Sequence, residues 1–204
     1  MASSVANTTS SKRRRLLLLA AAVALTILVP PVSARRLPVQ LVVYVHEILD
    51  GPGQTEKLLI RGPGPENPTL WPPNNLFGDT VVMDDLVTED LAIDSAPVGR
   101  VYGTYMTGSM TLPVHTVSFT LRLSAGPYNG STLVMAGIDD ETIAREHAVV
   151  GGTEALRGAQ GYVLGEVIPV SPPHYVVMKL TVNASVPVPT TKAKAAASHL
   201  IIDM

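Results

Sequence analysis

Alternation of apolar and polar side chains is the sequence feature that most constrains what this chain can fold into. In residues 175–183, Val176, Met178, Leu180 and Val182 point to one face of an extended segment, while polar side chains point to the other. Similar segments, each bounded by Gly, Pro, Asn or Asp, cover residues 41–49, 57–60, 79–86, 98–106, 114–123, 131–137, 147–150, 155–168 and 175–186. No amphipathic stretch between them is long enough for the crossover helix that a parallel sheet requires. The pattern therefore predicts an all-β protein, an antiparallel barrel or sandwich of about eight strands.

The composition removes several classes of functional site. The chain has 204 residues and no cysteine, which excludes a disulfide framework, a thiolate nucleophile and a cysteine-ligated metal. Its five histidines lack the spacing of metal ligands, and there is no phosphate-binding or dinucleotide-binding glycine motif. The acidic clusters at residues 84–85 and 139–141 lack the loop spacing of a calcium site, so we interpret them as solvated turns. We expect no metal and no cofactor.

The N-terminal residues have the features of a secretory leader. Basic residues at 12–15 precede an apolar run at 16–29, and Val32, Ser33 and Ala34 provide the small residues that a signal peptidase reads. The run is shorter than the about 20 residues that span a bilayer, which argues against the alternative of a signal anchor. We predict cleavage after Ala34 and a soluble, extracellular product.

Removal of residues 1–34 leaves an acidic domain. It carries 11 basic and 17 acidic side chains, a net charge of −6, without a basic cluster. Such a surface does not attract nucleic-acid phosphates, and no later segment is long and apolar enough to span a membrane. We expect the folded domain to cover residues 35–186 and residues 187–204 to form a disordered tail. Residues 61–75 contain five prolines, so we expect a loop that is mobile or lies across a rim.

Charged residues on otherwise apolar strand faces are the candidates for chemistry. Glu47 shares its face with three apolar residues. If that face is directed to the core, desolvation raises the pKa of Glu47 and suits it to general acid catalysis; alternatively, Glu47 lies at a strand end and reaches water. Asp139 is the second candidate, at the mouth of the strand that ends at residue 137. Arg145 and Arg157 could bind anionic or phenolic oxygens, or could lie on the surface.

Two N-glycosylation motifs remain in the predicted mature chain. Asn129 begins Asn-Gly-Ser in a Gly-rich turn, and Asn183 begins Asn-Ala-Ser on an outward strand face. In a secreted chain both can carry glycans.

Seven short motifs occur in series along the predicted strands. They are His46-Glu47-Ile48-Leu49, Phe-Gly-Asp-Thr-Val-Val-Met-Asp-Asp at 77–85, Val98-Gly99-Arg100 with Gly103 and Tyr105, Tyr-Asn-Gly-Ser-Thr-Leu at 128–133, Arg145-Glu146, Val-Val-Gly-Gly-Thr at 149–153 and Gly-Ala-Gln-Gly-Tyr at 158–162. In this order and at these intervals, the motifs resemble those of the plant dirigent protein family, and the resemblance covers residues 41–183.

The resemblance implies an eight-stranded antiparallel β-barrel, a homodimer or homotrimer, secreted to the apoplast. Dirigent proteins have no oxidising centre: a laccase or peroxidase makes phenoxy radicals from monolignols such as coniferyl alcohol, and the dirigent protein orients their coupling to one enantiomer of a lignan. Related members catalyse quinone-methide cyclisation. We keep open a phenolic-binding or lignin-organising wall protein without stereochemical control. A cyclase of the allene oxide cyclase type, which acts on an oxidised fatty acid, is a further alternative.

Site roles carry over residue by residue. By resemblance, Glu47 and Asp139 are the pocket acids, with Glu47 standing where the family usually has Asp. Tyr105 is a hydrogen-bonding wall, and Arg145 binds a phenol or carbonyl oxygen. Two further departures from the family, Tyr102 and the Gly-Glu pair at 165–166, are expected near the pocket.

Overall fold

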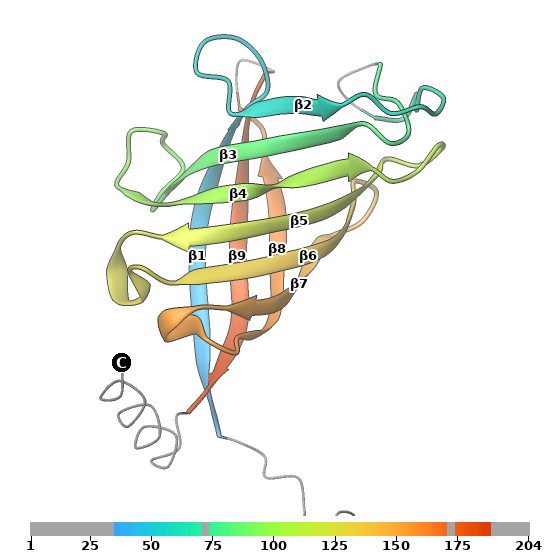
Figure 1. The fold of residues 1–204 in the computed structure, drawn as a ribbon. Coiled ribbons are helices and arrows are strands. Elements are labelled where there is room, and N and C mark those ends of the chain that lie inside the picture. Colours follow the sequence, from blue (N-terminus) through green and yellow to red (C-terminus); the bar gives the residue numbers. More distant parts are fainter. Residues whose placement is uncertain (1–34, 71–73, 171–173, 189–204) are drawn as a thin grey trace, which may run out of the picture. The chain divides into compact units, whose positions relative to one another are not determined.

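A computed structural model describes residues 35–70, 74–170 and 174–188, and the barrel lies within them (Figure 1). The strands are β1 (Arg36–Ile48), β2 (Glu56–Ile60), β3 (Thr80–Thr88), β4 (Pro97–Thr107), β5 (Val114–Leu123), β6 (Thr132–Asp140), β7 (Arg145–Gly152), β8 (Gln160–Ile168) and β9 (Tyr175–Pro187). Two short 3-10 turns, η1 (Gly126–Tyr128) and η2 (Glu154–Leu156), precede β6 and β8. A helix of the length and apolar character needed to cross a membrane is absent from these described ranges.

The predicted leader at residues 1–34 and residues 189–204 of the predicted tail lie outside the described residues. The first residue assigned to the tail, Pro187, is the last residue of β9, where it pairs with Arg36.

Every strand pairs antiparallel with its neighbours, and the sheet closes on itself. The order is β1-β9-β8-β7-β6-β5-β4-β3, and a further β1–β3 pairing joins the two ends into the expected eight-stranded barrel. In Figure 1, β1, β9 and β8 run steeply behind β3 to β7, as the tilted strands of a closed sheet must.

β3 changes partner along its length. Leu86 to Thr88 pair with Tyr44 to His46 of β1, whereas Thr80 to Met83 pair with β2. The ninth strand, β2, therefore continues the wall where β1 leaves it, and it lies at the upper edge of the sheet in Figure 1.

Three strand boundaries differ from those expected. β1 begins at Arg36, because its ladder with β9 extends to the end of that strand. β6 continues to Asp140, so Asp139 lies within the strand, opposite His115, and not beyond its end. The segment 155–168 is not one strand: η2 and a turn at Gly158, whose φ is +71°, precede β8.

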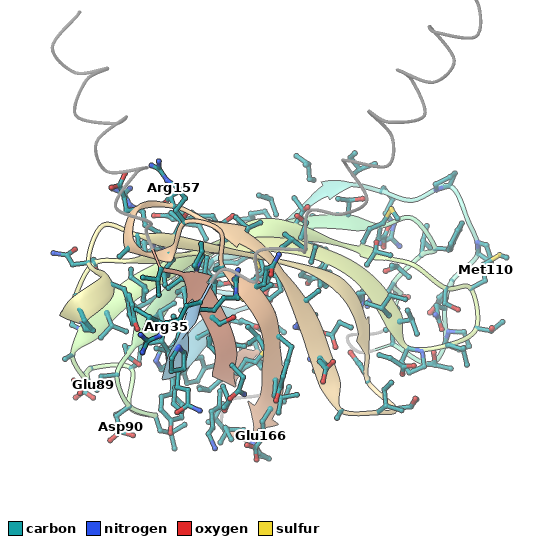
Figure 2. All side chains as sticks on the ribbon, turned by 90° about the horizontal axis from the view of Figure 1, so that it is seen from below. Arg35, Glu89, Asp90, Met110, Arg157 and Glu166 are labelled. Carbon is teal, nitrogen blue, oxygen red and sulfur yellow. The ribbon has the colours of Figure 1, made fainter. Side chains whose placement is uncertain are left out.

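The barrel interior has a packed end and a hollow end. On each strand, inward side chains alternate with outward ones; those nearer η1 and η2 form the apolar core. Leu156 of η2, fully buried, closes this packed end. The β3–β4 turn with Glu89 and Asp90 also lies at the packed end, whereas Met110 in the β4–β5 loop lies at the hollow end (Figure 2).

Candidate functional site

The hollow end of the barrel contains a pocket of about 500 Å³. Its apolar lining comes from Val45, Leu49, Leu58, Val81, Met83, Val101, Phe119, Val167, Val176, Met178 and Leu180. Its titratable lining inside the barrel comes from Glu47, Glu56, Tyr105, His115, Asp139, Glu141, Arg145 and His147. An apolar cavity with a few convergent polar groups is the usual form of a site for a small organic molecule.

Alternation explains how distant parts of the chain supply these groups. Arg145 and His147 occupy successive inward positions of β7, and Val149 continues the same face into the core. Cross-strand register then places His115 of β5 opposite Asp139 of β6. The four predicted site residues, from β1, β4, β6 and β7, therefore all line one cavity.

Arg145 holds the carboxylate of Asp139. Its Nε lies 3.1 Å from Asp139 Oδ1, and its Nη1 donates a hydrogen bond to Oδ2 at 3.2 Å. Arg145 Nη2 also lies 3.6 Å from Glu141 Oε1. Arg145 is thus neutralised by carboxylates at the pocket wall, and the surface alternative for it is wrong.

Glu47 is half-buried at the last-but-one position of β1. It lines the pocket although it lies at a strand end, so each of the two alternatives for Glu47 describes part of its environment. Burial, followed by the negative charges of Glu56 and Asp85, raises the pKa of Glu47 well above its ordinary value, and Arg145 opposes this shift. Glu47 is therefore suited to hold a proton near neutral pH.

Glu56 is a pocket acid that the sequence analysis did not identify. It is buried at the start of β2, and Tyr105 Oη donates a 2.6 Å hydrogen bond to its Oε2. Burial raises the pKa of Glu56, while the hydrogen bond from Tyr105 lowers it. Burial, together with the charge of Glu56, raises the pKa of Tyr105, so the phenol stays neutral. Its proton is directed to Glu56, which leaves the Tyr105 oxygen as an acceptor toward a guest. The sequence signal that could have identified Glu56 is its alternation with Leu58, which places both residues on the same face of the strand.

Asp85 overturns the interpretation of residues 84–85 as a solvated turn. Both residues lie within β3; Asp84 is exposed and pairs with Arg100, whereas Asp85 points inward and is fully buried. Burial raises the pKa of Asp85 to about 7. The alternation of Asp85 with Met83 and Val87 places all three on one strand face, and this pattern could have identified Asp85 as an inward residue.

Two buried histidines also line the pocket, and the sequence analysis considered them only as metal ligands. His115 packs edge-to-face on Tyr105, with ring centroids 5.2 Å apart, and His147 packs in the same way on Phe119 at 5.3 Å. Burial is the main cause that lowers the pKa of each imidazole. Both are therefore neutral near pH 7.

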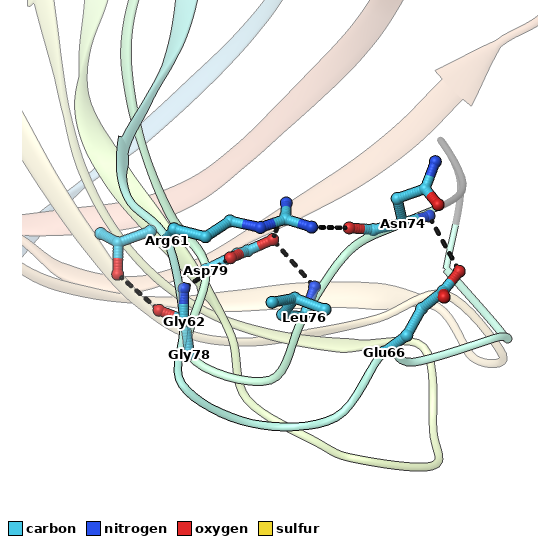
Figure 3. Close-up of polar contacts among 8 residues, drawn as sticks. Arg61, Gly62, Glu66, Asn74, Leu76, Gly78 and Asp79 are labelled. Carbon is cyan, nitrogen blue, oxygen red and sulfur yellow. Dashed lines mark hydrogen bonds and ion pairs between the residues drawn. The ribbon is translucent and has the colours of Figure 1, made fainter.

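The proline-rich segment forms part of the pocket rim. Arg61 and Asn74 contribute to its lining. The buried carboxylate of Asp79 accepts hydrogen bonds from the backbone N–H groups of Gly62 and Leu76 and from Arg61, whose other nitrogen bonds to Asn74 O (Figure 3). This network ties both ends of the segment to Asp79, the residue before β3, so the expectation that it lies across a rim is met by its described residues.

Several other candidates lie away from the pocket. Arg157 is exposed at the packed end, far from Met110 in Figure 2, so its surface alternative is correct. Tyr102 and Glu166, expected near the pocket, are exposed, and Glu166 pairs with Lys179 at 3.4 Å. Asn129 is exposed after η1, and Asn183 is half-buried in β9.

The site therefore combines an acid with a raised pKa, an ion-paired carboxylate and neutral hydrogen-bonding groups in an apolar cavity. Among the residues that the structure describes, no group of three or more His, Asp or Glu side chains has the arrangement of a metal site. The described side chains can orient an aromatic guest and move protons to and from its oxygens.

Fold and site together define a class of protein, an antiparallel β-barrel with an acid-containing pocket at one end. Residues 39–185 match the family model described as "Dirigent-like protein". The chain belongs to the dirigent family.

Curated relatives include proteins of two descriptions. "Dirigent protein 1" of Arabidopsis thaliana is 34% identical over 122 residues, which cover 59% of this chain and 64% of the relative. "Pterocarpan synthase 1" of Glycyrrhiza echinata is also 34% identical, over 58% of this chain and 62% of the relative. The matched region spans less than two thirds of the length of each of these relatives.

Two solved structures of pterocarpan synthase dirigent proteins have the same fold. GePTS1 superposes with a TM-score of 0.67 at 26% identity, covering 78% of this chain and 91% of that chain. PsPTS1 gives a TM-score of 0.65 at 27% identity, covering 76% and 97%.

Proposed function

We propose that this protein directs the stereochemistry of bond formation in reactive phenolic intermediates and does not oxidise them itself. The observation that carries the proposal is the coexistence, in one apolar pocket, of Glu47, whose pKa burial raises, and the ion-paired carboxylate of Asp139. Membership in the dirigent family supports the same role.

In the leading form of the proposal, a laccase or peroxidase supplies phenoxy radicals of a monolignol such as coniferyl alcohol. Two radicals couple in the pocket through a new C–C bond, so no further oxidant is needed after their formation. The pocket excludes approach geometries that lead to the wrong enantiomer. A facial preference of about 1.4 kcal/mol is enough for about tenfold selectivity, which packing against the apolar wall can provide.

A second candidate function is cyclisation of a quinone methide. Its support is the raised pKa of Glu47 together with the likeness to proteins described as pterocarpan synthases. Glu47 donates its proton to the quinone-methide carbonyl oxygen, and a hydroxyl of the same molecule attacks the methide carbon. A C–O bond forms, and the hydroxyl proton passes to the Asp139 carboxylate. The reaction is an isomerisation, and exchange with solvent returns the proton to Glu47.

The test is chiral chromatography of products formed with and without the purified protein. One arm contains laccase and coniferyl alcohol, and the other contains an isoflavanol that forms a quinone methide. Optically active product in the first arm supports the leading form, and optically active product in the second supports cyclisation. Racemic product in both arms, despite tight binding of the phenols, contradicts the proposal and favours a phenolic-binding protein. Turnover of an oxidised fatty acid instead would favour the allene oxide cyclase type.

We further propose that the protein is secreted to the apoplast. Expression of the full chain in leaf tissue, followed by mass spectrometry of the apoplastic fluid, tests this. The expected N-terminal residue is Arg35, and the expected glycan lies on Asn129, whose exposed turn accommodates one; the half-buried Asn183 offers less room. Retention of residues 1–34 in a cell-bound protein contradicts the proposal.

A further inference from the structure

We propose that His147 is a specificity-determining residue, which selects guests that carry a hydroxyl group on the aromatic ring placed against Phe119. The inference rests on the proposed function, because it assumes that the pocket binds phenolic molecules. It adds a recognition group to the acids and the arginine already described.

The first observation is that the polar atoms of His147 have no partner in the fold. The residue is 1% exposed and lines the pocket, yet neither Nδ1 nor Nε2 forms a hydrogen bond with any residue that the structure describes. A neutral imidazole has one donor and one acceptor, and a buried polar group without a partner costs stability. Both nitrogens are enclosed in the fold, so a turn of the imidazole toward the cavity brings them to a bound molecule.

The second observation is that the same fold satisfies a histidine where it is structural. His46 is also 1% exposed but does not line the pocket. Its Nδ1 lies 2.6 Å from Tyr175 Oη and its Nε2 lies 2.6 Å from Thr88 Oγ1, so both nitrogens are paired. Burial alone therefore does not leave an imidazole unpaired in this barrel; the difference lies in the cavity beside His147.

The surroundings of His147 define the chemistry of the guest. Burial is the main cause that lowers the pKa of His147, the charge of Asp139 opposes this shift and that of Arg145 adds to it, so the ring offers one N–H donor and one acceptor near pH 7. A hydroxyl group is likewise both donor and acceptor. The ring of Phe119, edge-to-face with the imidazole, provides an apolar aromatic surface at the same place. A hydroxylated aromatic ring can therefore exchange hydrogen bonds with His147 through its hydroxyl group and pack against Phe119 through its apolar face.

The test compares two guests that differ only in one hydroxyl. Equilibrium binding of coniferyl alcohol and of 3-methoxycinnamyl alcohol, which lacks the phenolic 4-hydroxyl, is measured by calorimetry. We expect wild type to prefer coniferyl alcohol by about tenfold, His147→Leu to abolish that preference, and His147→Gln, which keeps a donor and an acceptor, to restore most of it.

Stability measurements separate recognition from structure. Urea unfolding is expected to show His147→Leu as stable as wild type or more stable, because the substitution removes unpaired buried polar atoms. The matched variant His46→Leu should be less stable, because it removes a hydrogen-bond partner from both Tyr175 and Thr88. A loss of stability in His147→Leu comparable to that in His46→Leu, or an unchanged guest preference, overturns the inference.

These outcomes are distinct from those of the proposed function. Racemic products from a protein that binds selectively through His147 would contradict the proposed function alone. Stereoselective products with no effect of His147→Leu on guest preference would contradict this inference alone. Failure of wild type to bind either guest would contradict this inference and the leading form of the proposed function.

Discussion

At the scale of single residues, the barrel interior holds carboxyl groups in two different environments, one ion-paired and one buried without an ion pair, and each suggests its own substitution. Asp139→Asn removes the proton acceptor but keeps the shape of the side chain. We expect the product bias to be lost, or the cyclisation rate to fall by about 100-fold or more, which is typical of lost acid–base catalysis. The matched control is Asp140→Asn, because Asp140 is the next residue and its carboxylate accepts hydrogen bonds from Thr142 in the adjoining turn. Chiral chromatography measures the effect, and an unchanged enantiomeric excess in Asp139→Asn would remove this residue from the mechanism.

The pH dependence of stability provides a second test at the residue scale. Burial raises the pKa of Asp85 to about 7, above its value of about 3.9 in an unfolded chain. Between these values the folded state binds more protons than the unfolded state, so the contribution of Asp85 to stability falls as pH rises from about 4 to about 7. Asp85→Asn removes this dependence.

We therefore expect the stability of Asp85→Asn relative to wild type to increase from pH 4.5 to pH 7.5, a range that covers most of the window between about 4 and about 7. Urea unfolding at both pH values measures it. The control is Asp84→Asn, since Asp84 is exposed beside Arg100. A pH-independent difference between Asp85→Asn and wild type would contradict the assigned burial of this carboxyl group.

At the scale of elements, close approach of strands β8 and β9 depends on Gly161. Its φ is +150°, and a Cβ at this position would lie 2.2 Å from the carbonyl oxygen of Asn183. Gly161→Ala should therefore destabilise the protein by about 2 kcal/mol or more. Gly151→Ala, whose Cβ meets no atom within 4 Å, should change the free energy of unfolding by less than about 0.5 kcal/mol. Equal urea midpoints for the two variants would contradict this account of the β8–β9 contact.

The elements also show how far sequence alone could lead. Alternation was sufficient to assign most strands and to place Glu47 on the same face as three apolar residues, because the period of side-chain direction is a local property; it left open whether Glu47 reaches water. The pairing of His115 with Asp139 depends on long-range register, which no local pattern encodes. Glu56 and Asp85 were missed for another reason: carboxylates near turn residues are usually solvated, and only closure of the barrel buries these two.

At the scale of the whole molecule, the second edge of β2 is a candidate contact between copies of the barrel. No described strand pairs with that edge, and Leu59 and Ile60 are 61% and 56% exposed. Exposed, apolar strand edges recruit other strands. We expect the protein to form a homo-oligomer and Leu59→Lys to weaken it, as measured by sedimentation velocity. Val150→Lys, on a strand paired on both sides and 60% exposed, is the control. A monomeric wild type, or equal effects of the two lysines, would contradict this expectation.

The partner change along β3 has a consequence for how guests exchange with the interior. Strand β1 pairs directly with β3 only over residues 44–46 and 86–88 of the described chain, and Thr55 adds hydrogen bonds to Ile48 beside this pairing. In contrast, β1 and β9 pair along the whole length of β1, from Arg36 to Ile48. The side-chain hydrogen bond between His46 Nε2 and Thr88 Oγ1 adds one contact across this short β1–β3 pairing. We expect the β1–β3 pairing to open before any other strand pair, with faster deuterium uptake at Leu86 to Thr88 than at Leu121 to Leu123. A bulky product could then leave through the barrel wall between β1 and β3 while the apolar core at the packed end stays intact.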